Sequence, residues 1–85
     1  MTSLPALISR FPARELEIRR LCARDEDFRC VCEDYEAAVK ALGHWEGVEH
    51  DAARAAEYRQ LSAELAGEIV ALLDAASDLP PLATR

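Results

Sequence analysis

The chain has 85 residues, a formal net charge of −6 and only five aromatic residues. Such a length allows one small domain at most, and its core is thin. The acidic balance disfavours nonspecific binding to nucleic acid or to an anionic membrane. The longest apolar run, residues 69–73, is far too short to span a bilayer.

The cysteines and the start of the chain indicate a compartment. Three cysteines, an odd count without regular spacing, do not make a disulfide framework and fit a reducing environment better. The N-terminus has neither a basic segment nor a long apolar one, so we read no secretory signal there. We therefore expect a cytoplasmic protein.

The first ten residues predict a short helical segment. Ser3 precedes Leu4 and Pro5, and a serine cap with proline in the first turn is typical of a helix start. Pro12 disfavours helical geometry at Phe11 and limits this piece to one or two turns. We expect residues 1–10 to precede a separate helical unit over residues 11–77.

Residues about 12–46 predict one long helix. Its apolar stripe recurs at steps of three and four: Phe28, Val31, Tyr35, Ala38, Leu42 and Trp45. Before Phe28 the stripe shifts by roughly 100° around the helix. Either Asp25 or Asp27 recaps a bend there, or the two ends face different partners. Because no Gly or Pro interrupts the stretch, we favour a continuous or mildly bent helix, ending near a left-handed Gly47.

Residues about 51–77 predict a second helix, with Asp51 as its N-cap. The expected buried stripe is Tyr58, Leu61, Leu65, Ile69, Leu72 and Ala76, with Leu73 alongside. A short connection between two long helices predicts an antiparallel helical hairpin in an all-α fold. Residues 78–85 are expected to form a mobile tail.

The unequal helix lengths leave residues 4–19 overhanging in this arrangement. We expect a candidate interaction surface there, joined by the single tryptophan, for which core packing is the favoured alternative. Its residues are Leu4, Leu7, Ile8, Phe11, Ile18 and Trp45. A lone hairpin also leaves apolar flanks wet, and burying each such side chain is worth roughly 1.5–3 kcal/mol. We therefore expect a coiled-coil or four-helix-bundle assembly, with a second copy or another protein as partner.

The first half of the chain carries a recognisable line of residues. It runs through Phe11-Pro12, Ile18, Leu21, Asp25, Phe28, Tyr35 and Leu42. This line resembles the YdcH-like family of small bacterial proteins over residues 11–73. The resemblance implies a self-associating α-helical hairpin of largely unassigned function, and it brings no catalytic residues. The second helix departs from the family by being rich in alanine rather than lysine.

The cysteines and histidines carry the alternative hypothesis, a thiol- or metal-dependent accessory protein. It would use Cys22, Cys30, Cys32, His44 and His50. In a helix, residues two apart point about 200° away from each other, so the Cys-x-Cys pair cannot easily hold one ion. We expect Cys32 in the core, Cys30 exposed and Cys22 part-buried. The sequence predicts no catalytic residue, cofactor, metal site or small-molecule substrate, and we expect a non-enzymatic protein.

Overall fold

The computed structural model describes residues 3–47 and 51–77, most of which are helical, with no strand among them. The elements are α1 (Pro5–Arg10), the 3-10 helix η1 (Pro12–Arg14), α2 (Glu15–Arg24), α3 (Glu26–Glu46) and α4 (Ala52–Ser77). The all-α prediction is confirmed. The prediction of a mobile tail over residues 78–85 lies outside the described residues.

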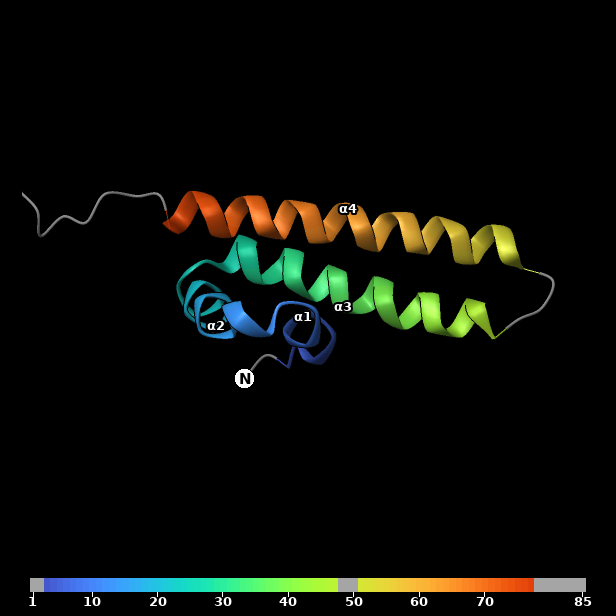
Figure 1. Cartoon of the computed structure of the whole chain (residues 1–85), viewed down its shortest axis with the longest axis horizontal. Helices are drawn as coiled ribbons and strands as arrows, with labels where there is room; N and C mark the ends of the chain where they lie inside the picture. The colour runs from blue at the N-terminus through green and yellow to red at the C-terminus, as the bar shows by residue number, and fades with distance from the viewer. Residues whose placement is uncertain (1–2, 48–50, 78–85) are drawn as a thin grey trace, which may run out of the picture.

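The two longest helices, α3 and α4, lie side by side and run in opposite directions (Figure 1). The 26 residues of α4 make a rod about 39 Å long at 1.5 Å per residue. The shorter elements α1 and α2 lie against one half of α3, and the other half of the α3–α4 pair extends beyond them. The molecule thus has a layered half and a two-helix half.

The single long helix predicted over residues 12–46 is wrong, because the chain breaks at Asp25. This residue has an extended backbone, with φ −132° and ψ 103°. Its side chain accepts a hydrogen bond of 3.1 Å from the backbone N–H of Phe28, and its own N–H donates to the Leu21 carbonyl at 2.8 Å. Asp25 therefore ends α2 and caps α3, an N-cap that satisfies an otherwise unpaired donor.

The predicted overhang is also wrong, since the break turns α1 and α2 back onto α3. Leu7 and Ile18 are fully buried, with 0% of their surface exposed, and Leu4 is 7% exposed. Ile8 and Phe11 are half-buried against the same core. An apolar overhang in water is less stable than a folded-back segment that buries it, which is the physical reason for the change.

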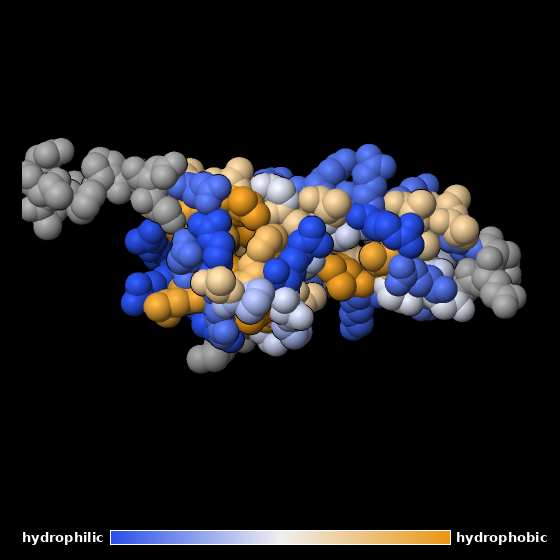
Figure 2. All heavy atoms as spheres, viewed as in Figure 1, coloured by the Kyte–Doolittle hydropathy of each residue, from blue (hydrophilic) through white to orange (hydrophobic). Residues whose placement is uncertain are grey.

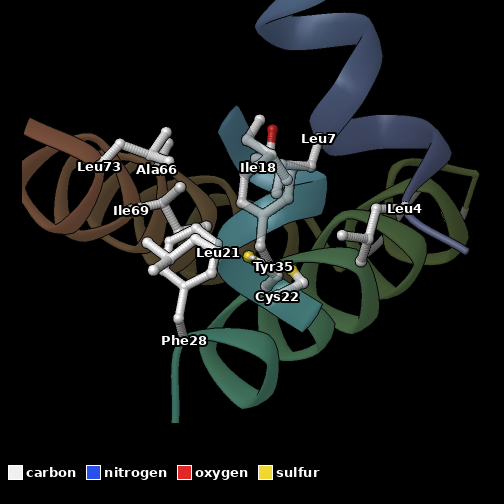
Figure 3. Close-up of a cluster of buried hydrophobic side chains, with 11 residues drawn as sticks. Leu4, Leu7, Ile18, Leu21, Cys22, Phe28, Tyr35, Ala66, Ile69 and Leu73 are labelled. Atoms are coloured by element: carbon white, nitrogen blue, oxygen red, sulfur yellow. Dashed lines mark hydrogen bonds between the residues drawn. The ribbon is translucent and has the colours of Figure 1, made fainter. Parts of the chain in front are cut away.

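One core cluster joins all four α-helices (Figure 3). Its buried members are Leu4, Leu7, Ile18, Leu21, Cys22, Phe28, Cys32, Tyr35, Ala66, Ile69 and Leu73. The shift of the apolar stripe before Phe28 therefore marks two helices that face each other. The cluster lies at the layered end of the molecule.

The row of α4 that contacts α3 matches the predicted stripe only in part: Ile69 and Leu73 are buried as predicted, and the rest of the row differs. Small residues, Ala55, Ser62 and Ala66, are buried together with Ile69 and Leu73. The Ser62 hydroxyl donates to the Arg59 carbonyl at 3.0 Å and is thereby satisfied. The predicted large residues Leu61 and Leu72 are instead 41% and 38% exposed. Small side chains let two helix axes approach closely, so they take the contact and turn the leucines outward.

Two predicted helix caps are replaced in the structure. Leu4, not Ser3, is the N-cap of α1, and it makes no side-chain cap. The Glu36 carboxylate of α3 takes that role by accepting the N–H groups of Ala6 at 3.2 Å and Leu7 at 2.8 Å. Gly47 ends α3 with φ −82°, in the right-handed region, so the predicted left-handed cap is wrong.

Across the two described ranges, no helix combines the length and the apolar character needed to cross a membrane.

Candidate interaction surface

An apolar groove of about 370 Å³ runs between α3 and α4. It is lined by Asp34, Ala37, Ala38 and Ala41 of α3 and by Tyr58, Leu61 and Leu65 of α4. By the helix period, Ala37 and Ala41 lie roughly 100° and 140° around α3 from Glu36, which holds α1, and no residue of α1 lines the groove. The groove therefore opens on the face of the pair that α1 does not cover.

The two walls of the groove differ in bulk. The α3 wall is made of alanine methyl groups, while the α4 wall carries the exposed Leu61 and the half-buried Tyr58 and Leu65. Leu72 continues the exposed side of α4 toward its C-terminus. We call Leu61, Leu65 and Leu72 the leucine flank. Apolar residues also appear along the strip between α3 and α4 in the space-filling view (Figure 2).

Trp45 lies at the end of α3 and is half-buried. The Arg54 guanidinium stacks over its ring at 4.7 Å from the centroid, and the His44 ring meets it edge-on at 4.9 Å. Cation–π and edge-to-face contacts of this kind hold the Trp45 ring in place at the end of α3. The core cluster contains Leu4, Leu7 and Ile18 but not Trp45. The structure therefore gathers five of the six predicted surface residues at the core, where they do not form an open surface, and leaves Trp45 apart from them.

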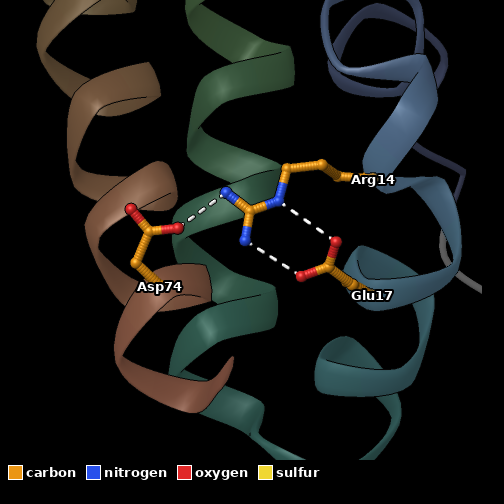
Figure 4. A network of polar contacts seen from close by, with 3 residues as sticks. All are labelled: Arg14, Glu17 and Asp74. Atoms are coloured by element: carbon orange, nitrogen blue, oxygen red, sulfur yellow. Dashed lines mark hydrogen bonds and ion pairs between the residues drawn. The ribbon is translucent and has the colours of Figure 1, made fainter. Parts of the chain in front are cut away.

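An ion pair joins the folded-back segment to α4 (Figure 4). The Arg14 guanidinium donates to Asp74 at 2.8 Å and to Glu17 at 2.9 Å. Both hydrogen bonds raise the pKa of Arg14 above its usual value, and the bond to Glu17 contributes more than the bond to Asp74. Arg19 pairs within its own helix, with Glu15 at 2.8 Å.

The cysteines occupy two environments. Cys30 is exposed and Cys32 is buried, as predicted, while Cys22 is buried rather than part-buried. The Sγ atoms of Cys22 and Cys32 lie 3.9 Å apart. Burial raises the pKa of both thiols, and the neighbouring Cys22 adds to the rise at Cys32. No pattern in the sequence predicts this contact, because it exists only once α2 turns back at Asp25.

The histidines of the alternative hypothesis are placed only in part. His44 lies at the end of α3 beside Trp45, and His50 lies outside the described residues. Within residues 3–47 and 51–77, no three side chains of His, Cys, Asp or Glu gather in a way that would hold a metal ion.

Comparison with known protein families, with curated proteins and with solved structures finds no match to this chain. The groove, the leucine flank and the thiols are therefore the features of this chain that indicate a function.

Proposed function

We propose that this is a non-enzymatic helical protein that associates with a second copy of itself through the groove and the leucine flank. The observation that carries the proposal is the exposure of Leu61 and Leu72 beside an alanine-lined groove. An exposed apolar row next to a groove is typical of a helix-packing surface.

The surface is complementary to itself. In a two-fold dimer the same patch is used twice, so a ridge on one copy needs a groove on the same face of the other. Leu61 forms such a ridge and the methyl groups of Ala37 and Ala41 line such a groove. A two-fold axis parallel to the helices sets α4 of each copy against α3 of the other, and so inserts each Leu61 into the alanine wall of the partner. The result is a four-helix bundle built from two antiparallel helical hairpins.

The size of the available surface also supports self-association. The α4 rod is about 39 Å long, and a standard interface buries about 800 Å² per partner. The half of the α3–α4 pair beyond α1 and α2 has two helices and no third layer (Figure 1). A second copy supplies that layer.

We also propose that the resemblance to the YdcH-like family reflects a shared fold, in a cytoplasmic bacterial protein. The support is that the residues of the line have structural roles here. Ile18, Leu21, Phe28 and Tyr35 are buried, and Asp25 caps α3. A line of core and cap residues specifies a fold and carries no chemistry.

Sedimentation velocity of the full chain over a concentration series tests self-association. We expect a dimer in the micromolar range and at least about tenfold weaker association for Leu61→Gln, since 1.4 kcal/mol is a factor of ten. Leu16→Gln is the matched control, because Leu16 is 59% exposed on α2, away from the groove. Circular dichroism confirms that both variants fold.

A chain that stays monomeric across the micromolar range overturns the proposal and leaves a different protein as the partner. Equal weakening by Leu16→Gln and Leu61→Gln also overturns it, because the interface would then include α2. Weakening by Leu61→Gln alone supports it.

A further inference from the structure

Two buried thiols from different helices touch inside the layered half of the molecule. The Sγ atom of Cys22 in α2 lies 3.9 Å from that of Cys32 in α3. Cys22 is 8% exposed and Cys32 is fully buried, and both belong to the core cluster (Figure 3). Their contact follows from the turn at Asp25, which folds α2 against α3.

We propose that Cys22 and Cys32 are an oxidisable dithiol, which a low-molecular-weight disulfide converts into an intramolecular disulfide joining α2 to α3. This inference is independent of self-association, because it concerns atoms within one chain. The sulfur atoms already touch, so a bond of about 2.05 Å requires their approach by roughly 2 Å. Only a small movement of α2 relative to α3 is needed.

The reaction balances as two thiol–disulfide exchanges. The Cys22 thiolate attacks one sulfur of the small disulfide, which forms a mixed disulfide and expels one small thiolate. The Cys32 thiolate then attacks the Cys22 sulfur and expels the second. The protein loses two electrons and two protons, and the small disulfide gains both to become two thiols.

The fold controls the rate of this oxidation. The thiolate is the attacking species, and burial raises the pKa of both cysteines. At Cys22 the hydrogen bond with Cys32 and the charge of Arg29 partly oppose that rise. Cys22, on the ten-residue helix α2, therefore makes the first attack on the small disulfide, when this helix separates from α3. A well-docked α2 makes oxidation slow.

The disulfide fixes the folded-back arrangement. It closes a short loop that contains the break at Asp25, and a cross-link of this kind restricts the unfolded chain. Separation of α2 from α3 is then prevented, whereas the reduced protein allows it. Oxidation therefore converts a non-covalent contact into a covalent one that lasts until it is reduced.

The test uses the full chain with Cys30→Ser, which removes the exposed thiol and leaves the buried pair. The protein is incubated with oxidised glutathione without denaturant, blocked with iodoacetamide and digested with trypsin. Cleavage after arginine and lysine separates residues 21–24 from residues 30–40. We expect these two peptides to be joined, with a loss of about 2 Da. The oxidised protein should keep its helical circular dichroism and gain several degrees in Tm.

A matched variant, Cys32→Ala, keeps Cys22 and Cys30. Because Cys30 is exposed and points away from the core, residues 21–24 should not become joined to residues 30–40 in this variant. Equal cross-linking in both variants overturns the proposal. Cross-linking of the Cys30→Ser protein only in denaturant overturns it too, as does an oxidised product with less helix or a lower Tm. These readouts do not depend on the oligomeric state.

Discussion

The Glu36 carboxylate of α3 accepts a hydrogen bond of 2.8 Å from the backbone N–H of Leu7, at the start of α1. A second oxygen of the same carboxylate accepts the N–H of Ala6 at 3.2 Å. A helix of six residues is marginal by itself, and its first N–H groups have no partner within the helix. One side chain from a distant part of the sequence thus caps α1 and holds it in place.

Replacing Glu36 by Gln should loosen α1. The amide keeps the shape but loses the negative charge, and hydrogen bonds to charged groups contribute about 1.5–3 kcal/mol. We expect the free energy of unfolding to fall by about 1–2 kcal/mol, by the same magnitudes. The amide of Leu7 should exchange hydrogen faster. Chemical denaturation and hydrogen exchange measure both effects. Glu33→Gln, on the exposed side of α3, is the control and should leave Leu7 protected.

Replacing Asp25 by Ala should cost more than replacing Asp27 by Ala. Asp25 accepts the Phe28 N–H, and loss of an N-cap typically costs about 0.5–2 kcal/mol. Asp27 is exposed in the first turn of α3, where a charge adds about 0.3–1 kcal/mol. Denaturation of the two variants makes the comparison. Equal stabilities would show that the cap does not hold the junction between α2 and α3.

Ile69→Ala and Leu72→Ala should separate the two faces of α4. Ile69 is fully buried in the core, and its truncation should destabilise the chain by about 2–5 kcal/mol. Leu72 is 38% exposed on the leucine flank, so its truncation should have a much smaller effect on the folded chain. Urea denaturation at low protein concentration, where the chain is monomeric, measures both. A larger loss for Leu72→Ala would contradict the observed burial of Ile69 and exposure of Leu72.

The buried thiols should make the protein less stable at alkaline pH. Burial raises the pKa of Cys22 and Cys32 in the folded state above the unfolded value of about 8.5. The unfolded chain then loses these protons first. This contribution is fully present below the unfolded pKa and is lost as pH rises toward the folded pKa.

Denaturation at pH 7 and pH 10, with reductant present, measures this alkaline loss. The Cys22→Ala/Cys32→Ala variant should lose less stability between the two pH values than the parent chain, after its fold is checked at pH 7. Cys30→Ala is the control, because an exposed thiol does not carry the effect. The same pH dependence in all three proteins would contradict the assignment to the buried pair.

The sequence by itself determined the helical class and the approximate ends of most helices. Apolar spacing of three and four residues, with proline and glycine near the ends, is a local signal, and it predicts helices correctly over α1, α3 and α4. The shift of the apolar stripe before Phe28 was also visible in the sequence. The local pattern could not decide between a continuous helix and a turn, because both satisfy it.

Only the tertiary structure decided how those helices pack. Folding at Asp25 buries Leu7 and Ile18, and the energy of that burial comes from contacts distant in sequence. The choice of Ala55, Ser62 and Ala66 for the contact with α3 depends on how closely two helices approach, which hydropathy does not encode. The same packing leaves Leu61 outside and brings Cys22 against Cys32, because side-chain shape and chain reversal, rather than local pattern, set those positions.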